Sequence, residues 1–485
     1  MAIDVRSALR VVGAAGILGV LGEILFHDAA WGLNIAVWIA ALGLGAILLS
    51  KRLDRRIPKP VVALAPAILL FAGCFAIHEA PELKLANGLA LFLLMGAALA
   101  STSRGNLTKS SIYELSVDVV RAWFRLTSNF AKLIADERLL PKSDEAKARI
   151  RAVVNGVLIA TPLLVVFGGL FVSADDDFRR LVTGVFDFHW VNPYWLLQTV
   201  AIFVICAVMA GGTYRVLLLE QAAELPETQL SDPLHHPQLG MTEISVVLGL
   251  LNAMFGLFVV VQAQYFFGGV HQVLTVQGLT DSKYARHGFF ELTAVAAGAM
   301  ATILVFQSLM KDPERNQRSF RILAGTMVAL VGVVLISAFQ RMDLYVRFAG
   351  LTEMRVYATS FMVWIASTLV WLAATALRGR RRRFAWGSMV CGLACILGLN
   401  VLNPDVAIAR FDTQPTNRPA DLALLESLSV DAAPAFVNGL PGLPPGQATQ
   451  LRTELKKRWS QAVDTDWRGI NYSRWRYLND YRHEL

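Results

Sequence analysis

The chain has 485 residues, of which 55% are hydrophobic and only 17% are charged, whereas a soluble domain usually carries about 25% charged residues. This composition excludes an ordinary soluble globular protein. We assign the formal net charge of +8 to the cytoplasmic loops of a membrane protein, where Lys and Arg accumulate, and we expect no nucleic-acid partner.

Eleven apolar runs approach the length of about 20 residues that crosses a bilayer as a helix. They lie at residues 8–26, 31–50, 61–78, 85–101, 152–173, 194–214, 241–266, 289–310, 322–340, 356–377 and 384–401. The predicted fold class is therefore all-α: a polytopic transmembrane helical bundle with a small helical C-terminal tail. Its expected parts are a four-span N-terminal bundle at 1–101, a cytoplasmic amphipathic helix and linker at 102–151, a seven-span core at 152–401 and an extracytoplasmic tail at 402–485.

The distribution of basic residues predicts the orientation. With a cytoplasmic N-terminus, the cytoplasmic segments contain 27 Lys and Arg residues and the external loops contain eight. This asymmetry is typical of proteins that follow the positive-inside rule. Eleven crossings then place the C-terminus outside the cytoplasm. The last run is the weakest, because it is short and contains Gly387, Gly392 and Gly398; without that crossing the tail would be cytoplasmic.

The region between the fourth and fifth runs predicts an amphipathic helix beside the membrane. Apolar residues recur there at steps of three and four, which places them on one helix face: Ile112, Leu115, Val119, Trp123, Leu126, Phe130 and Leu133. Arg121 and Arg125 lie beside this stripe, so the helix is expected in the headgroup plane. It is either a docking surface for a protein partner or anionic lipid, or a linker packed under its own bundle.

Two stretches, 277–292 and 340–358, hold charged, aromatic and turn residues densely between apolar runs. Both contain Gly-Leu-Thr, which indicates a duplicated helical hairpin. Their charges can pair across the outer rim, so the stretches form either a polar site for an anionic or zwitterionic ligand or a salt-bridged structural cap. The residues of this outer-rim motif are Gln264, Tyr284, Arg286, Glu291, Arg341, Asp343, Tyr345, Arg355 and Tyr357.

No signature of a hydrolase, zinc protease, P-loop or dinucleotide-binding protein occurs in the sequence. We therefore expect no catalytic residue, no cofactor and no enzymatic activity. Histidines gather near the predicted outer face without the spacing of metal ligands, so no metal is expected either: His27, His78, His189, His271 and His287. The middle thirds of the predicted spans lack Asp, Glu, Lys and Arg, which disfavours an ion-driven transporter but leaves a carrier of lipid-like cargo open.

After residue 401 the composition changes to short helical units separated by the breaker LPGLPPG. This pattern predicts a small helical cap, or alternatively a helical module that binds a peptide or protein partner.

The stretches GLTDSKYARHGFFEL, SAFQRMDLYVRFAGLTEMRVYA and LNPDVAIARFD resemble a bacterial family of multi-pass membrane proteins catalogued as domain of unknown function number 4173, with a related family numbered 4153. LESLSVDAAPA and DWRGINYSRWR are similar to the tail of that family. The resemblance implies a helical fold in the bacterial inner membrane and implies no catalytic residues.

Together these observations favour a non-enzymatic envelope scaffold or signalling partner in the bacterial cytoplasmic membrane. Besides the lipid bilayer, we expect a protein partner to bind through the tail or the cytoplasmic amphipathic helix. The alternative is a permease or flippase-like carrier of a lipid-like or small-molecule substrate.

Overall fold

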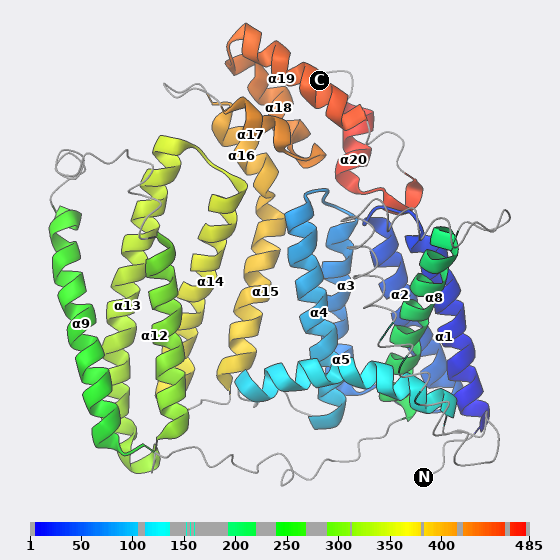
Figure 1. Ribbon diagram of the computed structural model, residues 1–485, viewed down its shortest axis with the longest axis horizontal. Helices are drawn as coiled ribbons and strands as arrows, with labels where there is room; N and C mark the ends of the chain where they lie inside the picture. Colours follow the sequence, from blue (N-terminus) through cyan, green and yellow to red (C-terminus); the bar gives the residue numbers. More distant parts are fainter. Residues whose placement is uncertain are drawn as a thin grey trace, which may run out of the picture. The chain divides into compact units, whose positions relative to one another are not determined.

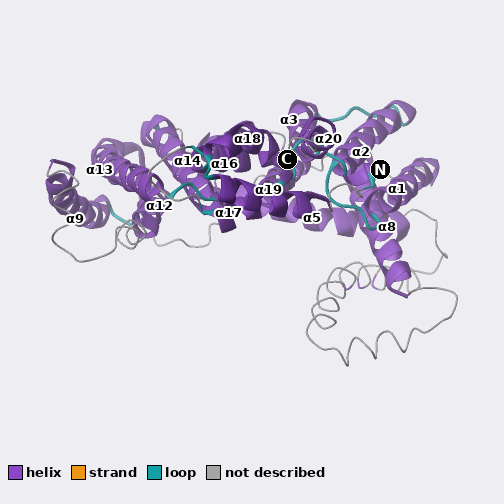
Figure 2. Ribbon diagram, turned by 90° about the horizontal axis from the view of Figure 1, so that it is seen from above, coloured by secondary structure: helices purple, strands orange, loops and turns teal. Residues whose placement is uncertain are grey.

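The computed structural model describes residues 5–104, 112–135, 193–219, 239–267, 289–310, 313–379, 383–414, 421–460 and 466–481, and the single positions 152, 156 and 160. Every regular element in these residues is a helix, and the described chain contains no strand (Figure 1; Figure 2). An isolated bridge pairs Leu239 with Met310. The predicted all-α class is thus confirmed for the described residues.

The chain forms two units. Unit 1 consists of Met1–Leu107, Ser116–Glu227 and Asp464–Trp475, and unit 2 consists of Thr108–Leu115, Thr228–Val463 and Arg476–Leu485. Unit 1 therefore contains a piece of the C-terminal tail as well as the N-terminal helices.

Nine helices in the described part of the chain are long and apolar enough to cross a membrane. They are α1, α2, α4, α8, α9, α12, α13, α14 and α15. Of the eleven predicted spans, the one at 61–78 forms the 17-residue helix α3, Lys59–Phe75, which contains Pro66. At 1.5 Å per residue it is about 26 Å long, slightly less than the hydrocarbon thickness. The span predicted at 152–173 lies outside the described residues, apart from the three single positions 152, 156 and 160.

The helices of unit 1 pack through small residues. Their bounds are α1 Val5–Phe26, α2 Leu33–Arg52, α3 Lys59–Phe75, α4 Pro81–Arg104 and α8 Pro193–Tyr214, the last extended by the π-helical turn Arg215–Leu219. Helices α1 and α8 lie side by side in both views (Figure 1; Figure 2). Gly19 faces Phe203 and Gly22 faces Cys206, and a Cβ at Gly22 would overlap the cysteine side chain. Close approach at glycine is a usual basis of helix association in membranes.

Helix α5, Ile112–Ala135, runs across the other helices of unit 1 (Figure 1). Trp123 stacks on Phe92 of α4 with 4.7 Å between ring centroids. Leu126 is buried at Gly212, and Phe130 lies against Gly211 of α8. Trp123, Leu126 and Phe130 of the predicted stripe are therefore covered by the protein's own helices.

Unit 2 is built around a long central helix, α13. Its membrane helices are α9 Met241–Phe267, α12 Phe289–Leu309, α13 Pro313–Ala349, α14 Glu353–Thr375 and α15 Phe384–Leu402. Small and apolar side chains of α13, among them Ala324, Val331 and Ala338, are fully buried in the core shared with α9, α12 and α14.

The run predicted as a span at 322–340 forms part of a longer helix, because α13 continues beyond Gln340 to Ala349. The sequence between them is rich in charge but contains neither Gly nor Pro, so nothing in it breaks a helix. Gly350, with φ of 84°, then ends the helix in the left-handed conformation that glycine adopts most readily.

The tail helices of unit 2 enclose a small core of their own. The elements are α16 Pro404–Asp412, α17 Leu422–Ser427, η6 Val430–Ala432, α18 Ala433–Gly439, η7 Leu440–Gly442, α19 Pro445–Ser460 and η9 Tyr477–Tyr481. The Trp459 ring lies 6.0 Å from the Phe436 ring and 5.2 Å from the Tyr477 ring. Leu451 and Leu455 complete the buried face of α19, so the tail is folded as a compact helical module.

Replacing the buried Trp459 by alanine should destabilise this module by about 3–5 kcal/mol, because it removes a large core side chain. Limited proteolysis of the full-length protein in lipid discs should then cleave α19 faster. The matched control is Trp467→Ala, which removes an exposed tryptophan from unit 1. Equal cleavage of α19 in both variants would contradict this account of the tail core.

Candidate functional site

The residues 466–475, here called the strap segment, lie along the helix ends of unit 1. The segment contains the turn η8, Trp467–Gly469, and the start of α20, Tyr472–Arg476. The Tyr472 N–H donates to the Ala76 carbonyl at 2.8 Å, and the Ser473 N–H donates to the Ile77 carbonyl at 3.1 Å. The Leu33 N–H donates to the Ile470 carbonyl at 3.1 Å. Backbone bonds therefore join the strap segment to the start of α2 and the end of α3.

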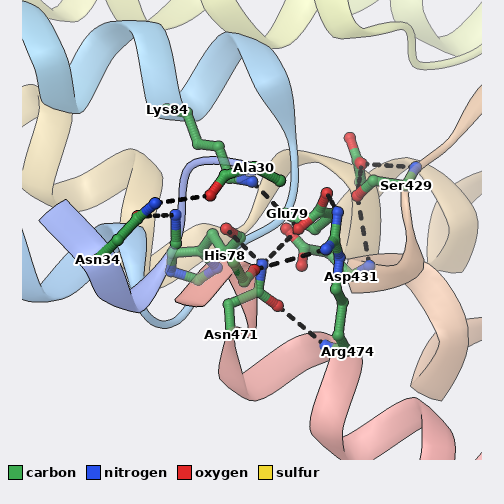
Figure 3. Close-up of polar contacts among 12 residues, drawn as sticks. Ala30, Asn34, His78, Glu79, Lys84, Ser429, Asp431, Asn471 and Arg474 are labelled. Atoms are coloured by element: carbon green, nitrogen blue, oxygen red, sulfur yellow. Dashed lines mark hydrogen bonds and ion pairs between the residues drawn. The ribbon is translucent and has the colours of Figure 1, made fainter. Parts of the chain in front are cut away.

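A buried ion-pair cluster, here called the tail lock, fastens the strap segment to the loop between α3 and α4. It consists of Glu79, Lys84, Asn471 and Arg474 (Figure 3). One Glu79 carboxylate oxygen pairs with the Arg474 guanidinium. The other accepts from the Lys84 ammonium at 3.1 Å and from the Asn471 amide. Exposed fractions of 17% for Glu79, 9% for Lys84 and 11% for Arg474 show that water screens these charges little.

Asn471 orders the strap segment at the tail lock. Its amide nitrogen also donates to the His78 carbonyl at 3.3 Å, and its side-chain oxygen accepts the Arg474 N–H at 2.9 Å. The second contact is an N-cap for the first turn of α20. One buried side chain thus binds the α3–α4 loop and also sets the backbone position from which Arg474 reaches Glu79.

The loop between α1 and α2 supports the strap segment from the other side. Buried Asn34 accepts from the Gly32 N–H at 2.9 Å and donates to the Ala30 carbonyl at 2.9 Å (Figure 3). The Gly469 backbone lies so near Gly32 that a Cβ there would overlap the Gly469 carbonyl. Glycine is therefore required at position 32 for this close approach of two chain segments.

Arg468 adds a further contact with α1. Its guanidinium donates to the Ile24 carbonyl at 2.5 Å and pairs with Asp466. The pKa of Asp466 is lowered, first because the Arg468 backbone N–H donates to its carboxylate and also because of the nearby guanidinium. The carboxylate therefore stays ionised, and its contribution to the contact is lost only as pH falls through this lowered pKa.

A second polar cluster joins α1 to α8 at the same end of unit 1. His27 Nδ1 lies 3.2 Å from a Glu23 oxygen and 3.3 Å from the Thr199 hydroxyl. Gln198 donates to Asp28 at 3.0 Å. Although His27 has acidic neighbours, no group of three or more His, Cys, Asp and Glu residues suited to a metal ion occurs in the described part of the chain.

The outer-rim motif of unit 2 is only partly described. Tyr284 and Arg286 lie outside the described residues, and Gln264 falls within α9. Glu291 lies in the first turn of α12 and is exposed. Tyr357, which is partly buried, lies near the start of α14.

Near the end of α13, Arg341 is partly buried, whereas Asp343 forms an exposed 2.8 Å pair with Arg347. Tyr345 and Arg355 are brought together across the α13–α14 turn. The Arg355 guanidinium lies 3.9 Å from the centre of the Tyr345 ring.

The α13–α14 turn is also held from within unit 2. Arg355 donates to the Gly350 carbonyl, and Asp412 of α16 accepts the Leu351 N–H at 3.3 Å. These contacts are of the kind that a structural cap makes. The choice between a cap and a ligand site at this rim stays a prediction.

The four residues assigned to the interfacial helix divide between its two faces. Trp123 and Phe130 pack against α4 and α8. Arg125 donates to the Ser103 hydroxyl, while Arg121 is exposed. A partner of α5 would therefore meet the face that carries Arg121 and the exposed Phe124 rather than the apolar stripe.

The sequence alone does not predict the tail lock. Glu79 and Arg474 lie 395 positions apart, so no spacing rule joins them. The available signal was a carboxylate and an ammonium, Glu79 and Lys84, flanking the start of an apolar helix. That pattern alone does not predict that the side chains of Glu79 and Lys84 are largely buried.

The family described as a domain of unknown function, DUF4153, matches residues 64–439 of the chain. The match includes Glu79 and Lys84 and ends at the last residue of α18, so the strap segment lies beyond it. No curated protein and no solved structure matches the sequence. The matched family is the second of the two that the sequence motifs indicate.

Replacing Glu79 by glutamine should release the strap segment, because Lys84 and Arg474 then remain buried without their carboxylate. Breaking a buried ion pair in this way costs about 3–5 kcal/mol. The expected result is faster proteolysis of the strap segment in the full-length protein, with the membrane helices intact.

The control for this prediction is Arg347→Ala, which breaks a pair whose side chains are 71% and 58% exposed. Such a pair contributes about 0–1 kcal/mol. If proteolysis cleaved the strap segment equally slowly in both variants, the tail lock would not be what holds the segment in place.

Proposed function

The chain belongs to the family described as a domain of unknown function, DUF4153, and we propose that this member of the family is a scaffold. In this proposal it is a non-enzymatic, multi-pass protein of the bacterial inner membrane that holds a folded helical tail outside the cytoplasm for a protein partner. Bacterial origin and a relation to the family numbered 4173 belong to the proposal, and both are supported by the sequence motifs.

The orientation is supported by the charges at the two ends of unit 1. The Arg10 guanidinium donates to the Arg52 carbonyl at 3.0 Å, so the start of α1 meets the end of α2. Lys51 and Arg55 lie at that same end. The strap segment lies at the other end, where α1 and α3 finish and α2 begins. Positive charge favours the cytoplasmic side, so the strap segment is assigned to the outside.

The tail lock is the observation that carries the proposal. A tail that served only as a flexible extension would need neither a buried aromatic core nor buried charges. The tail of this protein has a buried aromatic core around Trp459 in unit 2. It also has a buried charge, that of Arg474, in unit 1. A partner would therefore meet a surface of fixed shape, which lowers the conformational entropy lost on binding.

Helix α19 gives such a partner a surface to bind. Leu451, Leu455 and Trp459 are buried on one side of the helix. The opposite side carries exposed charged residues of both signs, including Glu454 and Lys456. Mixed charge on a fixed helix favours recognition of a partner with a complementary pattern.

The test compares full-length wild type with Glu79→Gln and Arg347→Ala, each isolated in native-lipid discs and analysed by mass spectrometry. We expect a stoichiometric protein partner with wild type and Arg347→Ala, and a clear loss of that partner with Glu79→Gln. A lipid or small molecule retained equally by all three, with no protein partner, would contradict the scaffold function and favour the carrier.

A further inference from the structure

The strap segment turns its polar side chains towards the protein and its aromatic side chains away from it. Asn471 is 3% exposed, and the Arg474 side chain is buried in the tail lock. By contrast, Trp467 is 60% exposed, Tyr472 is 51% exposed and Trp475 is 50% exposed. All three aromatic residues of the segment therefore point outward.

This arrangement is the reverse of the one expected for a segment that faces water. Contact with water disfavours large apolar rings, whereas Asn and Arg side chains are readily solvated. Several exposed aromatic side chains close together usually mark a surface that contacts lipid or another molecule. Tyr472 and Trp475 are also stacked, with 6.0 Å between their ring centroids, so they form one continuous apolar surface.

The position of the segment identifies the surroundings of these rings. Tyr472 and Ser473 are bonded to the backbone where α3 ends, and Arg468 is bonded to Ile24 in the last turn of α1. At the ends of apolar membrane helices, the hydrocarbon of the bilayer gives way to lipid headgroups. Ile24 and Ile77 are both exposed there, so the lipid-facing surface of the helices continues up to the strap segment.

We infer that Trp467, Tyr472 and Trp475, together with the exposed Trp31 of the α1–α2 loop, form an interfacial anchor in the outer leaflet. Their ligand is the headgroup and glycerol region of phospholipids. Trp and Tyr suit this region because each combines an apolar ring with one polar group that can hydrogen-bond to headgroups or water. The strap segment is thus held by the tail lock on its inner side and by lipid on its outer side. The contact with lipid does not depend on the scaffold function, whereas its assignment to the outer leaflet rests on the orientation proposed above.

The test uses the full-length protein in phosphatidylcholine discs, made with ordinary lipid or with lipid brominated near the glycerol end of its acyl chains. Bromine quenches nearby tryptophan fluorescence. The signal of interest is the emission of wild type minus that of Trp467→Phe/Trp475→Phe. We expect this difference emission to lose most of its intensity in brominated discs and to resist aqueous iodide.

Two results would overturn the inference. Difference emission that is quenched by iodide and unaffected by bromine would place the rings in water. Emission that neither reagent quenches would place them against protein, either another part of this chain or a partner.

Two controls keep the measurement interpretable. Trp459→Phe removes a tryptophan from the tail core, and its difference emission should be insensitive to brominated lipid and to iodide. The single variants Trp467→Phe and Trp475→Phe are measured separately, so a folding defect in the double variant does not remove the test. For each single variant the signal is again the emission of wild type minus that of the variant. If brominated lipid quenched neither of these two difference emissions, the anchor would be contradicted.

Discussion

The end of unit 1 that carries the strap segment depends on one carboxylate, that of Glu79, which lies between Lys84 at the start of α4 and Arg474 in the strap segment. A buried charge is costly unless charges and hydrogen bonds of the surrounding chain compensate it. Asn471 supplies a hydrogen bond and, through its N-cap, also positions Arg474. Glu79 lies in the α3–α4 loop, and its three partners are Lys84 at the start of α4 and Asn471 and Arg474 in the tail. Glu79 therefore ties the last part of the chain to its N-terminal helices.

Unit 2 also uses polar residues of the tail to bind turns of the chain. Asp412 of α16 accepts the Leu351 N–H in the α13–α14 turn, and Asp405 accepts from the backbone and the hydroxyl of Ser429. Both aspartates are buried. In each unit, then, buried side chains from the residues after α15 satisfy backbone or charged groups at turns. This explains why the tail folds as ordered helices rather than extending from the last membrane helix.

The sequence was sufficient to predict most of the helices and insufficient to predict the tail lock. Apolar runs of about 20 residues specify membrane helices directly, and a three-to-four residue repeat predicted α5 and its buried stripe. The end of α13 was missed because charged residues such as Arg341 suggested a loop, although they are compatible with a helix. The contact between Glu79 and Arg474, and the outward direction of Trp467 and Trp475, arise only when distant segments fold together. Neither has a local periodicity from which it could be inferred.

The most direct test of the account is a disulfide cross-link in intact membranes between Ile77→Cys and Ser473→Cys, with the four native cysteines replaced. The Ser473 N–H lies 3.1 Å from the Ile77 carbonyl, so the two side chains start from neighbouring backbone positions. The account predicts an efficient intramolecular disulfide in the wild-type background and much less of it when Glu79 is replaced by glutamine. Absence of the disulfide in the wild-type background would contradict the docking of the strap segment on unit 1.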